Sequence, residues 1–391
     1  MRKSLSVTLL LLALVVPMLA ACGSAGTGTA PTAAPVATAA TEPTAAPAAT
    51  AATEPTTATE PTAATEPTAG TAPTAGTVGS GEKLKVGLVT DVGKVNDGTF
   101  NQFAYEGLQR AATELGVETA YIETQAQSDY IKNIDQFASQ DFDMIIAVGF
   151  LMGDAIKEAA AKYPNIKFAI VDFAYDPVIP NVRGLLFAED EAGYLAGALA
   201  GLMTKSGTIA VVGGQEIPPV QKYVIGYENG AKSVKADVDV KKVYIDSFTD
   251  RARGGEAAKD FISQGADVIF GAGGQTGSGG IQAAAQQGVY VIGVDQDEYL
   301  TTFQNGAGPG SDKLLSSAVK RVDNAVFAAI KEAQEGNFEG GTELFNAQNE
   351  GVGLAEFHDA DANIPAEVKT KLEEILKGLS DGTVKTEVTL P

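Results

Sequence analysis

From Lys83 onward, short apolar runs alternate with stretches of helical spacing. The run from Lys83 to Asp91 is rich in apolar residues from Val86 to Val89 and ends in a carboxylate, which predicts a strand. Apolar positions from Phe100 to Leu115 recur every three or four residues and stop before Gly116, which predicts a helix. Further strands are predicted at 117–124, 144–149, 167–172 and 182–187, with helices at 131–138, 154–162 and 191–204.

A second series of the same kind begins at Thr208. Strands are predicted at 208–214, 242–248, 267–271 and 289–295, followed by a long helix at 314–334 and a final one at 366–379. Strands that are continuously apolar and alternate with helices are typical of parallel sheets covered on both faces. The pattern therefore predicts an α/β protein with two lobes, each a parallel sheet flanked by helices.

The segment 23–82 has no such pattern. It consists almost wholly of Ala, Thr, Pro, Gly and Glu, and the unit Thr-Glu-Pro-Thr recurs from Thr41, Thr53, Thr59 and Thr65. Without apolar side chains to bury, it cannot offset the entropy of ordering, so we predict a disordered, extended spacer. A recognition or glycosylated segment is the alternative reading.

Residues 1–22 have the features of an export signal. Arg2 and Lys3 supply positive charge, a short apolar run follows, and small residues precede Cys22. This ending resembles a bacterial lipobox, in which the cysteine is lipidated and becomes the new N-terminus. An ordinary signal peptide cleaved near Ala21 is the alternative. We expect a protein anchored by lipid on Cys22 to the extracytoplasmic face of the cell membrane.

Composition and charge exclude several classes of function. With 28 Lys and Arg against 49 Asp and Glu, the net charge of −21 argues against binding nucleic-acid phosphates. One Cys and one His cannot form a Cys/His zinc site, an iron–sulfur centre or a disulfide framework, so we expect no metal site.

Motifs for nucleotide hydrolysis and nucleophilic catalysis are incomplete. The stretch Gly274–Gly279 has the glycine spacing of a phosphate-binding loop, but Gly280-Ile281 follows where Lys and Ser or Thr are required. We expect no serine in a nucleophile elbow, since the glycine-rich context of Ser278, Thr276-Gly277-Ser278-Gly279, lacks the Gly-x-Ser-x-Gly pattern. The single histidine, His358, lies in a polar stretch typical of the surface. We therefore expect neither a catalytic residue nor a cofactor.

Polar residues stand where the predicted strands end. Three aspartates, Asp91, Asp172 and Asp295, occupy such ends, together with Phe248 and the glycines up to Gly274. Parallel sheets bind ligands at the carboxyl ends of their strands. Carboxylates, an aromatic ring and glycines suit a polar small molecule with a flat part, although a purely structural turn explains the glycines equally well.

A family resemblance rests on several such segments in order. The stretch from Thr90 to Gln102, with Gly107 following, resembles the N-terminal signature of the basic membrane protein family. The likeness continues through nearly all of residues 83–360, in Phe168–Asp172, Phe187–Gly197, Gly226–Gly230, Ser247–Asp250, Gly293–Asp297 and Ser316–Asp323. Members are bacterial substrate-binding lipoproteins, and the best-understood ones are purine nucleoside receptors of ABC importers.

The resemblance implies a two-lobed periplasmic-binding-protein-like fold of type I, or cluster B. Phe100 and Phe248 would come from opposite lobes and hold a purine ring between them. Polar contacts would come from Asp91, Asn101, Asp172, Asp295 and Lys320, and Gly274 would admit backbone groups to the ligand. Asp97 and Asp172 have a second reading as helix or turn caps.

The sequence thus predicts three parts: a signal (1–22), a spacer (23–82) and a ligand-binding domain (83–391). Within the domain we expect lobe 1 at about 83–188 plus 299–335, and lobe 2 at about 189–298 plus 336–391. The predicted function is a monomeric, non-enzymatic receptor that captures a nucleoside, purine preferred, and delivers it to an ABC permease in the membrane. A sugar or signal-molecule receptor of the same fold and a nucleoside-processing enzyme are the alternatives.

Overall fold

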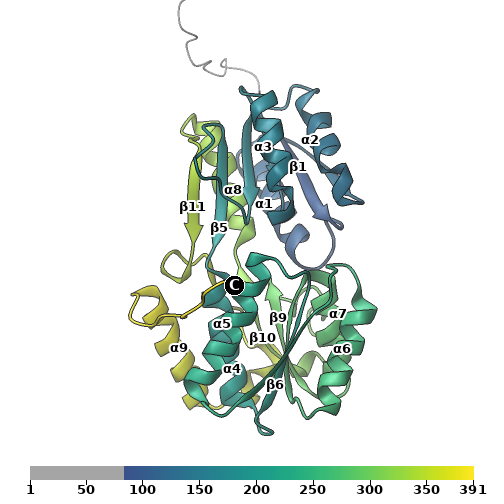
Figure 1. The fold of residues 1–391 in the computed structure, drawn as a ribbon, viewed down its shortest axis with the longest axis vertical. Helices are drawn as coiled ribbons and strands as arrows, with labels where there is room; N and C mark the ends of the chain where they lie inside the picture. The colour runs from purple at the N-terminus through teal and green to yellow at the C-terminus, as the bar shows by residue number, and fades with distance from the viewer. Residues whose placement is uncertain (1–82) are drawn as a thin grey trace, which may run out of the picture. The chain divides into compact units, whose positions relative to one another are not determined.

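The computed structural model describes residues 83–391. The predicted signal peptide (1–22), the spacer (23–82) and the lipidation site Cys22 lie outside these residues. Within them, two six-stranded sheets are each enclosed by helices (Figure 1). The predicted α/β fold with two sheet-based lobes is therefore confirmed.

The sheet of lobe 1 has the strand order β11-β5-β4-β3-β1-β2, and all of its pairs are parallel. Helices α1 and α8 pack together beside this sheet, and α2 and α3 form a second pair. Its elements are β1 (Lys85–Val92), α1 (Phe100–Glu114), β2 (Glu118–Thr124), α2 (Tyr130–Ala138), β3 (Met144–Ala147), α3 (Gly153–Lys162), β4 (Lys167–Val171), β5 (Val182–Phe187), α8 (Val322–Glu335) and β11 (Gly341–Phe345), with short 3-10 turns at Gln127–Asp129 and Phe150–Met152.

The sheet of lobe 2 has the order β12-β10-β9-β8-β6-β7, in which only β12 runs antiparallel to its neighbour. Helix α4 packs on α5, and α6 packs on α7. Its elements are α4 (Glu189–Met203), β6 (Thr208–Gly213), α5 (Pro218–Val234), β7 (Asp239–Tyr244), α6 (Arg251–Ser263), β8 (Val268–Ala272), α7 (Gly274–Ala285), β9 (Tyr290–Asp295), β10 (Leu314–Lys320), β12 (Val352–Leu354) and α9 (Ala366–Ser380), with 3-10 turns at Ser311–Lys313, Ala347–Asn349 and His358–Asn363.

The C-terminal part of the chain divides between the lobes differently from expectation. The chain crosses between the sheets three times, after β5, after β10 and after β11. Segment 299–320 thus belongs to lobe 2, because β10 pairs with β9, and β11 belongs to lobe 1, because it pairs with β5. Pairing between strands that are far apart in the chain cannot be inferred from the local sequence pattern, so the lobe boundaries were not predicted correctly there.

Two predicted elements need correction. The helix expected at 314–334 is a strand, β10, followed by helix α8 from Val322. Six of the seven β10 residues are buried, and a short apolar run of this kind does not by itself distinguish strand from helix. Strand β7 lies at 239–244 rather than 242–248; it is an edge strand without buried residues, so its apolar pattern is weak.

Glycines allow the helix pairs of lobe 2 to approach closely. A Cβ atom on Gly193 or Gly197 of α4 would overlap the carbonyl oxygens of Tyr223 and Tyr227 of α5. On α5, Gly230 faces the Tyr194 carbonyl in the same way. Spacing of four residues places these glycines on one helix face, so that backbone packs against backbone.

Among residues 83–391, none of the helices combines the length and the apolar character that crossing a membrane requires.

Candidate functional site

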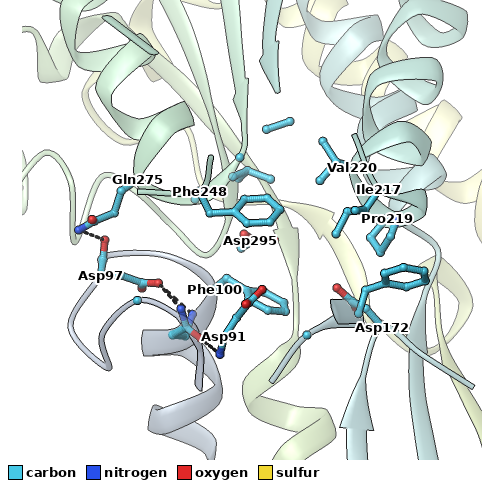
Figure 2. A pocket seen from close by; sticks show the side chains of 18 of the residues that line it. Asp91, Asp97, Phe100, Asp172, Ile217, Pro219, Val220, Phe248, Gln275 and Asp295 are labelled. Atoms are coloured by element: carbon cyan, nitrogen blue, oxygen red, sulfur yellow. Dashed lines mark hydrogen bonds between the residues drawn. The ribbon is translucent and has the colours of Figure 1, made fainter. Parts of the chain in front are cut away.

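A cavity lies between the lobes, at the carboxyl ends of the strands of both sheets (Figure 2). It encloses about 680 Å³, part of it open to solvent. All eight residues predicted to contact a ligand line it: Asp91, Phe100, Asn101, Asp172, Phe248, Gly274, Asp295 and Lys320. The fold therefore brings together residues that are far apart in sequence, as the strand-end argument predicts.

Two of the three strand-end aspartates have an unusual backbone. Asp172 follows β4 with φ +70°, and Asp295 ends β9 with φ +65°. This left-handed conformation is uncommon for residues other than glycine and is best tolerated by Asn and Asp. Both aspartates are nearly buried and face the cavity, so the strained turns aim two carboxylates at the same space.

The Asp91 carboxylate is oriented by its neighbours. One of its oxygens, Oδ1, accepts hydrogen bonds from the Val92 amide (2.6 Å) and from the Tyr130 hydroxyl. The Asp91 amide in turn donates to Oδ1 of Asn101 (3.0 Å). Because the Val92 amide and the Tyr130 hydroxyl both bind Oδ1, the other carboxylate oxygen, Oδ2, lies toward Gly149, which also lines the cavity. The sequence reasoning missed Tyr130, which is separated from Asp91 by helix α1 and strand β2.

Asp97 caps the start of α1. Its carboxylate accepts from the backbone amides of Thr99 (2.9 Å), Asn101 (3.2 Å) and Gln102 (3.1 Å), and from the Asn101 side chain (3.0 Å). These are the amides that a helix N-terminus leaves without internal partners. The capping role considered for Asp97 is thus confirmed, and this residue also lines the cavity.

Lys320 joins the lobes through a buried ion-pair network. Its Nζ lies 2.6 and 2.7 Å from the two Asp172 oxygens and 3.0 Å from Oε1 of Glu189. Glu189 also pairs with Lys222, at 3.0 Å. Only Oδ2 of Asp172 has hydrogen-bond geometry toward Lys320, so its buried Oδ1 remains without a hydrogen bond. Both Asp172 oxygens thus lie against the Lys320 ammonium group, and Glu189 is a network member that the sequence did not reveal.

Burial and the charge network shift the pKa values of these groups. Burial raises the pKa of Asp295 to about 7; Lys320 works against this rise, and Asp172 adds to it. Burial likewise raises the pKa of Asp172, against the effect of Lys320. Burial opposes the charge on Lys320, but Asp172, Glu189 and Asp295 outweigh it and raise the Lys320 pKa. The cavity is thus rich in oxygen acceptors around one firmly charged ammonium group.

The two predicted aromatic residues come from opposite lobes. Phe100 is the first residue of α1, and Phe248 lies in the loop between β7 and α6. Figure 2 shows the two rings facing the same space from either side. The Phe248 ring packs so closely on Gly214 that a Cβ atom there would overlap it, and Gly274, with φ +54°, lies under the Phe248 carbonyl. Glycines thereby fix the position of this ring.

One wall of the cavity was not foreseen. Ile217, Pro219 and Val220, at the start of α5, and Phe150 from lobe 1 add an apolar surface. Prolines at the first turn are typical of a helix start, but nothing local indicates that this start faces a cleft.

His358 does not line the cavity. It is partly buried rather than exposed: its ring stacks on Tyr299, with centroids 4.0 Å apart, and Nε2 lies 2.6 Å from Asp297. Within residues 83–391, no cluster of three or more His, Cys, Asp or Glu side chains is placed to hold a metal ion.

Two sheet-based lobes, three crossings and an acceptor-rich cleft between the lobes define a type I solute-binding protein. The sequence model of the Bmp family, described as "ABC transporter substrate-binding protein PnrA-like", matches residues 84–384. The chain belongs to this family of ABC transporter substrate-binding proteins.

Named relatives and a solved structure agree with this assignment. The chain is 34% identical over 315 residues to the ABC transporter nucleoside-binding protein BmpA of Lactococcus lactis, covering 77% of this chain and 88% of the relative. It is 35% identical over 289 residues to an uncharacterized lipoprotein of Pyrococcus horikoshii, covering 70% and 69%. A solute-binding protein of an ABC transporter from Aeropyrum pernix superposes with a TM-score of 0.69 at 28% identity, covering 77% of this chain and 92% of that one.

Proposed function

We propose that this protein captures a nucleoside, purine preferred, in the cleft between its lobes and presents it to an ABC permease. The observation that carries the proposal is the placement of Phe100 and Phe248 on opposite sides of one cavity. Stacking of a base on aromatic rings contributes about 1–3 kcal/mol per contact. A flat heterocycle between the rings would use both faces.

The polar part of the cavity suits a ribose. Asp91, Asp172 and Asp295 offer carboxylate oxygens, which accept hydrogen bonds from hydroxyl groups. Asp91 keeps Oδ2 available, because its hydrogen bonds from Val92 and Tyr130 both go to Oδ1. A nucleoside carries no charge and needs no basic pocket, in agreement with an acidic chain whose central ammonium group is already paired.

Calorimetry of the full chain tests the ligand class. Titration with adenosine, guanosine, inosine, uridine and free ribose should give tight binding of purine nucleosides and weak binding of ribose. Equal affinity for ribose would favour a sugar receptor, and the absence of binding by every nucleoside would overturn the proposal. Release of free base on prolonged incubation would place the protein among enzymes, against our proposal that it has no catalytic activity.

Replacing Phe248 separates stacking from the rest of the site. Phe248→Ala should lower purine nucleoside affinity by about 10- to 100-fold, which corresponds to the loss of one stacking contact. Phe338→Ala is the matched control, because Phe338 is also half-buried but does not line the cavity. Unchanged affinity in Phe248→Ala would remove the aromatic sandwich from the proposal.

We further propose that the protein is monomeric, lies outside the cytoplasm and is held to the cell membrane by lipid on Cys22. The position of the single cysteine after a short apolar run and the lipoprotein relative support this anchor. Cys22→Ser should release the protein from the membrane fraction, and a variant that stays bound would contradict lipidation at this site.

A further inference from the structure

Three side chains of lobe 2 donate hydrogen bonds to three successive carbonyl oxygens of lobe 1. Thr301 Oγ1 donates to Gly98 (2.7 Å), Gln296 Nε2 to Thr99 (3.1 Å) and Gln275 Nε2 to Asp97 (3.4 Å). Figure 2 shows the last of these at the edge of the cavity. The receiving loop, residues 97–99, lies directly before α1.

The loop is shaped to present these carbonyls. The Asp97 carboxylate draws the amides of Thr99, Asn101 and Gln102 inward, so the carbonyl side of the loop faces the other lobe. Gly98 has φ +81°, a conformation that glycine adopts without strain. The Thr99 oxygen also accepts the helical bond from Phe103 (3.0 Å), which uses one of its two lone pairs and leaves the other for Gln296.

Two of the three donors are tied to the cavity: Gln275 itself lines it, and Gln296 adjoins a residue that does. Gln275 follows Gly274, and Gln296 follows Asp295. On the other side, the loop leads directly into Phe100 and Asn101. The three bonds therefore connect the two walls of the cavity through protein groups alone.

We propose that Gln275, Gln296 and Thr301 are positioning residues that form a ligand-independent clamp between the lobes. The clamp holds the cavity wall that carries Phe100 opposite the wall that carries Phe248. It thereby raises the fraction of unliganded molecules whose cleft has the conformation that binds the ligand. Apparent affinity scales with this fraction, so the clamp strengthens binding through the arrangement of the two lobes. The effect on affinity rests on the function proposed above, whereas the effect on the unliganded lobes does not.

A distance measurement between the lobes tests the clamp. Dyes are attached at Glu158→Cys on α3 and Lys259→Cys on α6, both exposed, in a full chain that carries Cys22→Ser. Energy transfer is recorded without ligand, and guanosine affinity is measured by calorimetry on the same proteins. The clamp variant combines Gln296→Ala and Thr301→Val, and it keeps Gln275 because that side chain lines the cavity.

The matched control is Gln334→Ala. The Gln334 side chain also donates to a backbone carbonyl, that of Leu115 at 2.8 Å, but both residues belong to lobe 1. This variant loses the same kind of bond without uncoupling the lobes. Thr301→Val alone, which preserves side-chain shape, carries the test if the double variant does not fold.

In the clamp variant we expect a wider and more variable dye separation without ligand, and guanosine affinity weaker on the order of tenfold. The control should match the parent protein in both readings, and the melting temperatures should be alike. An unchanged dye separation in the clamp variant would overturn the proposal. If no nucleoside binds the parent protein, the proposed function is wrong. The dye separation without ligand still tests the clamp in that case.

Discussion

At the scale of single residues, the cleft depends on groups that never need to meet the ligand. Tyr130 holds one oxygen of Asp91, and Glu189 holds Lys320, which in turn holds Asp172. Such outer contacts fix the direction of a carboxylate, and hydrogen bonds to the charged form also make ionisation easier. The directions of Asp91 and Asp172 are thus set before a ligand arrives.

Replacing Tyr130 should change the pH dependence of binding. Burial raises the pKa of Asp91, and the Tyr130 hydroxyl works against this rise. Tyr130→Phe removes that opposition, so the Asp91 pKa should rise further and the carboxylate should take up its proton at higher pH. On the proposed function, in which ionised Asp91 contacts the ligand, nucleoside affinity should therefore fall on acidification at a higher pH in the variant than in the parent protein.

Calorimetric titration with guanosine across the acid range measures this shift. Tyr175→Phe is the control, because Tyr175 donates to the Gly153 carbonyl (2.6 Å) and not to a carboxylate. A merely structural role for Tyr130 would weaken binding equally at every pH, and that result would contradict the positioning role.

At the scale of elements, glycine spacing decides how closely α4 and α5 pack. The Tyr227 carbonyl occupies the place that a methyl group on Gly197 would need. Backbone cannot move aside as the end of a long side chain can, so a larger residue must push the helices apart. Because α4 begins at Glu189 and α5 carries Lys222, such a shift would also disturb the ion-pair network of the cleft.

Two glycine-to-alanine changes should have opposite effects on stability. Gly197→Ala should lower the free energy of unfolding by about 1–3 kcal/mol, the usual cost of overpacking. Gly255→Ala, in α6, should raise it by about 0.5–1 kcal/mol, because a Cβ there meets only ordinary contacts and alanine favours the helix. Urea denaturation followed by circular dichroism compares the two, and equal effects would refute the packing argument.

At the scale of the whole molecule, buried acids link stability to pH. Burial raises the pKa of Asp295 from 3.8 to about 7 and that of Glu298 from 4.5 to about 7. The folded chain therefore binds more protons than the unfolded chain between about pH 4 and pH 7. The stability that these two groups contribute is complete below their pKa values in the unfolded chain. It is lost as the pH rises through their pKa values in the folded chain.

The unliganded protein should therefore gain stability from these two groups as the pH falls from about 7 to about 4. Asp295→Asn should raise the melting temperature at pH 7.5 and make its pH dependence shallower over that range. Asp237→Asn is the control, since Asp237 is exposed. Scanning calorimetry at several pH values measures both, and an Asp295→Asn slope equal to that of the parent protein would contradict the linkage.

The sequence alone determined the class of fold and most of the residues around the cleft. Short apolar runs and a helical spacing of three to four residues are local patterns, and they placed strands β1 to β6 and helices α1 to α4 close to their observed bounds. Residues at the carboxyl ends of parallel strands meet at one edge of a sheet, which accounts for Asp91 and Asp172 in lobe 1. That Asp295, at the end of β9 in lobe 2, joins them was expected from the family likeness.

Only the tertiary structure decided which lobe holds β10 and β11, because sheet pairing acts between segments far apart in the chain. It also revealed the Tyr130 bond to Asp91, the Glu189 link to Lys320 and the three clamp bonds. Each joins an ordinary side chain to a distant group, and a hydrogen bond depends on where two atoms lie in space. The sequence therefore indicated what lines the cleft, and the fold decided how those groups are held.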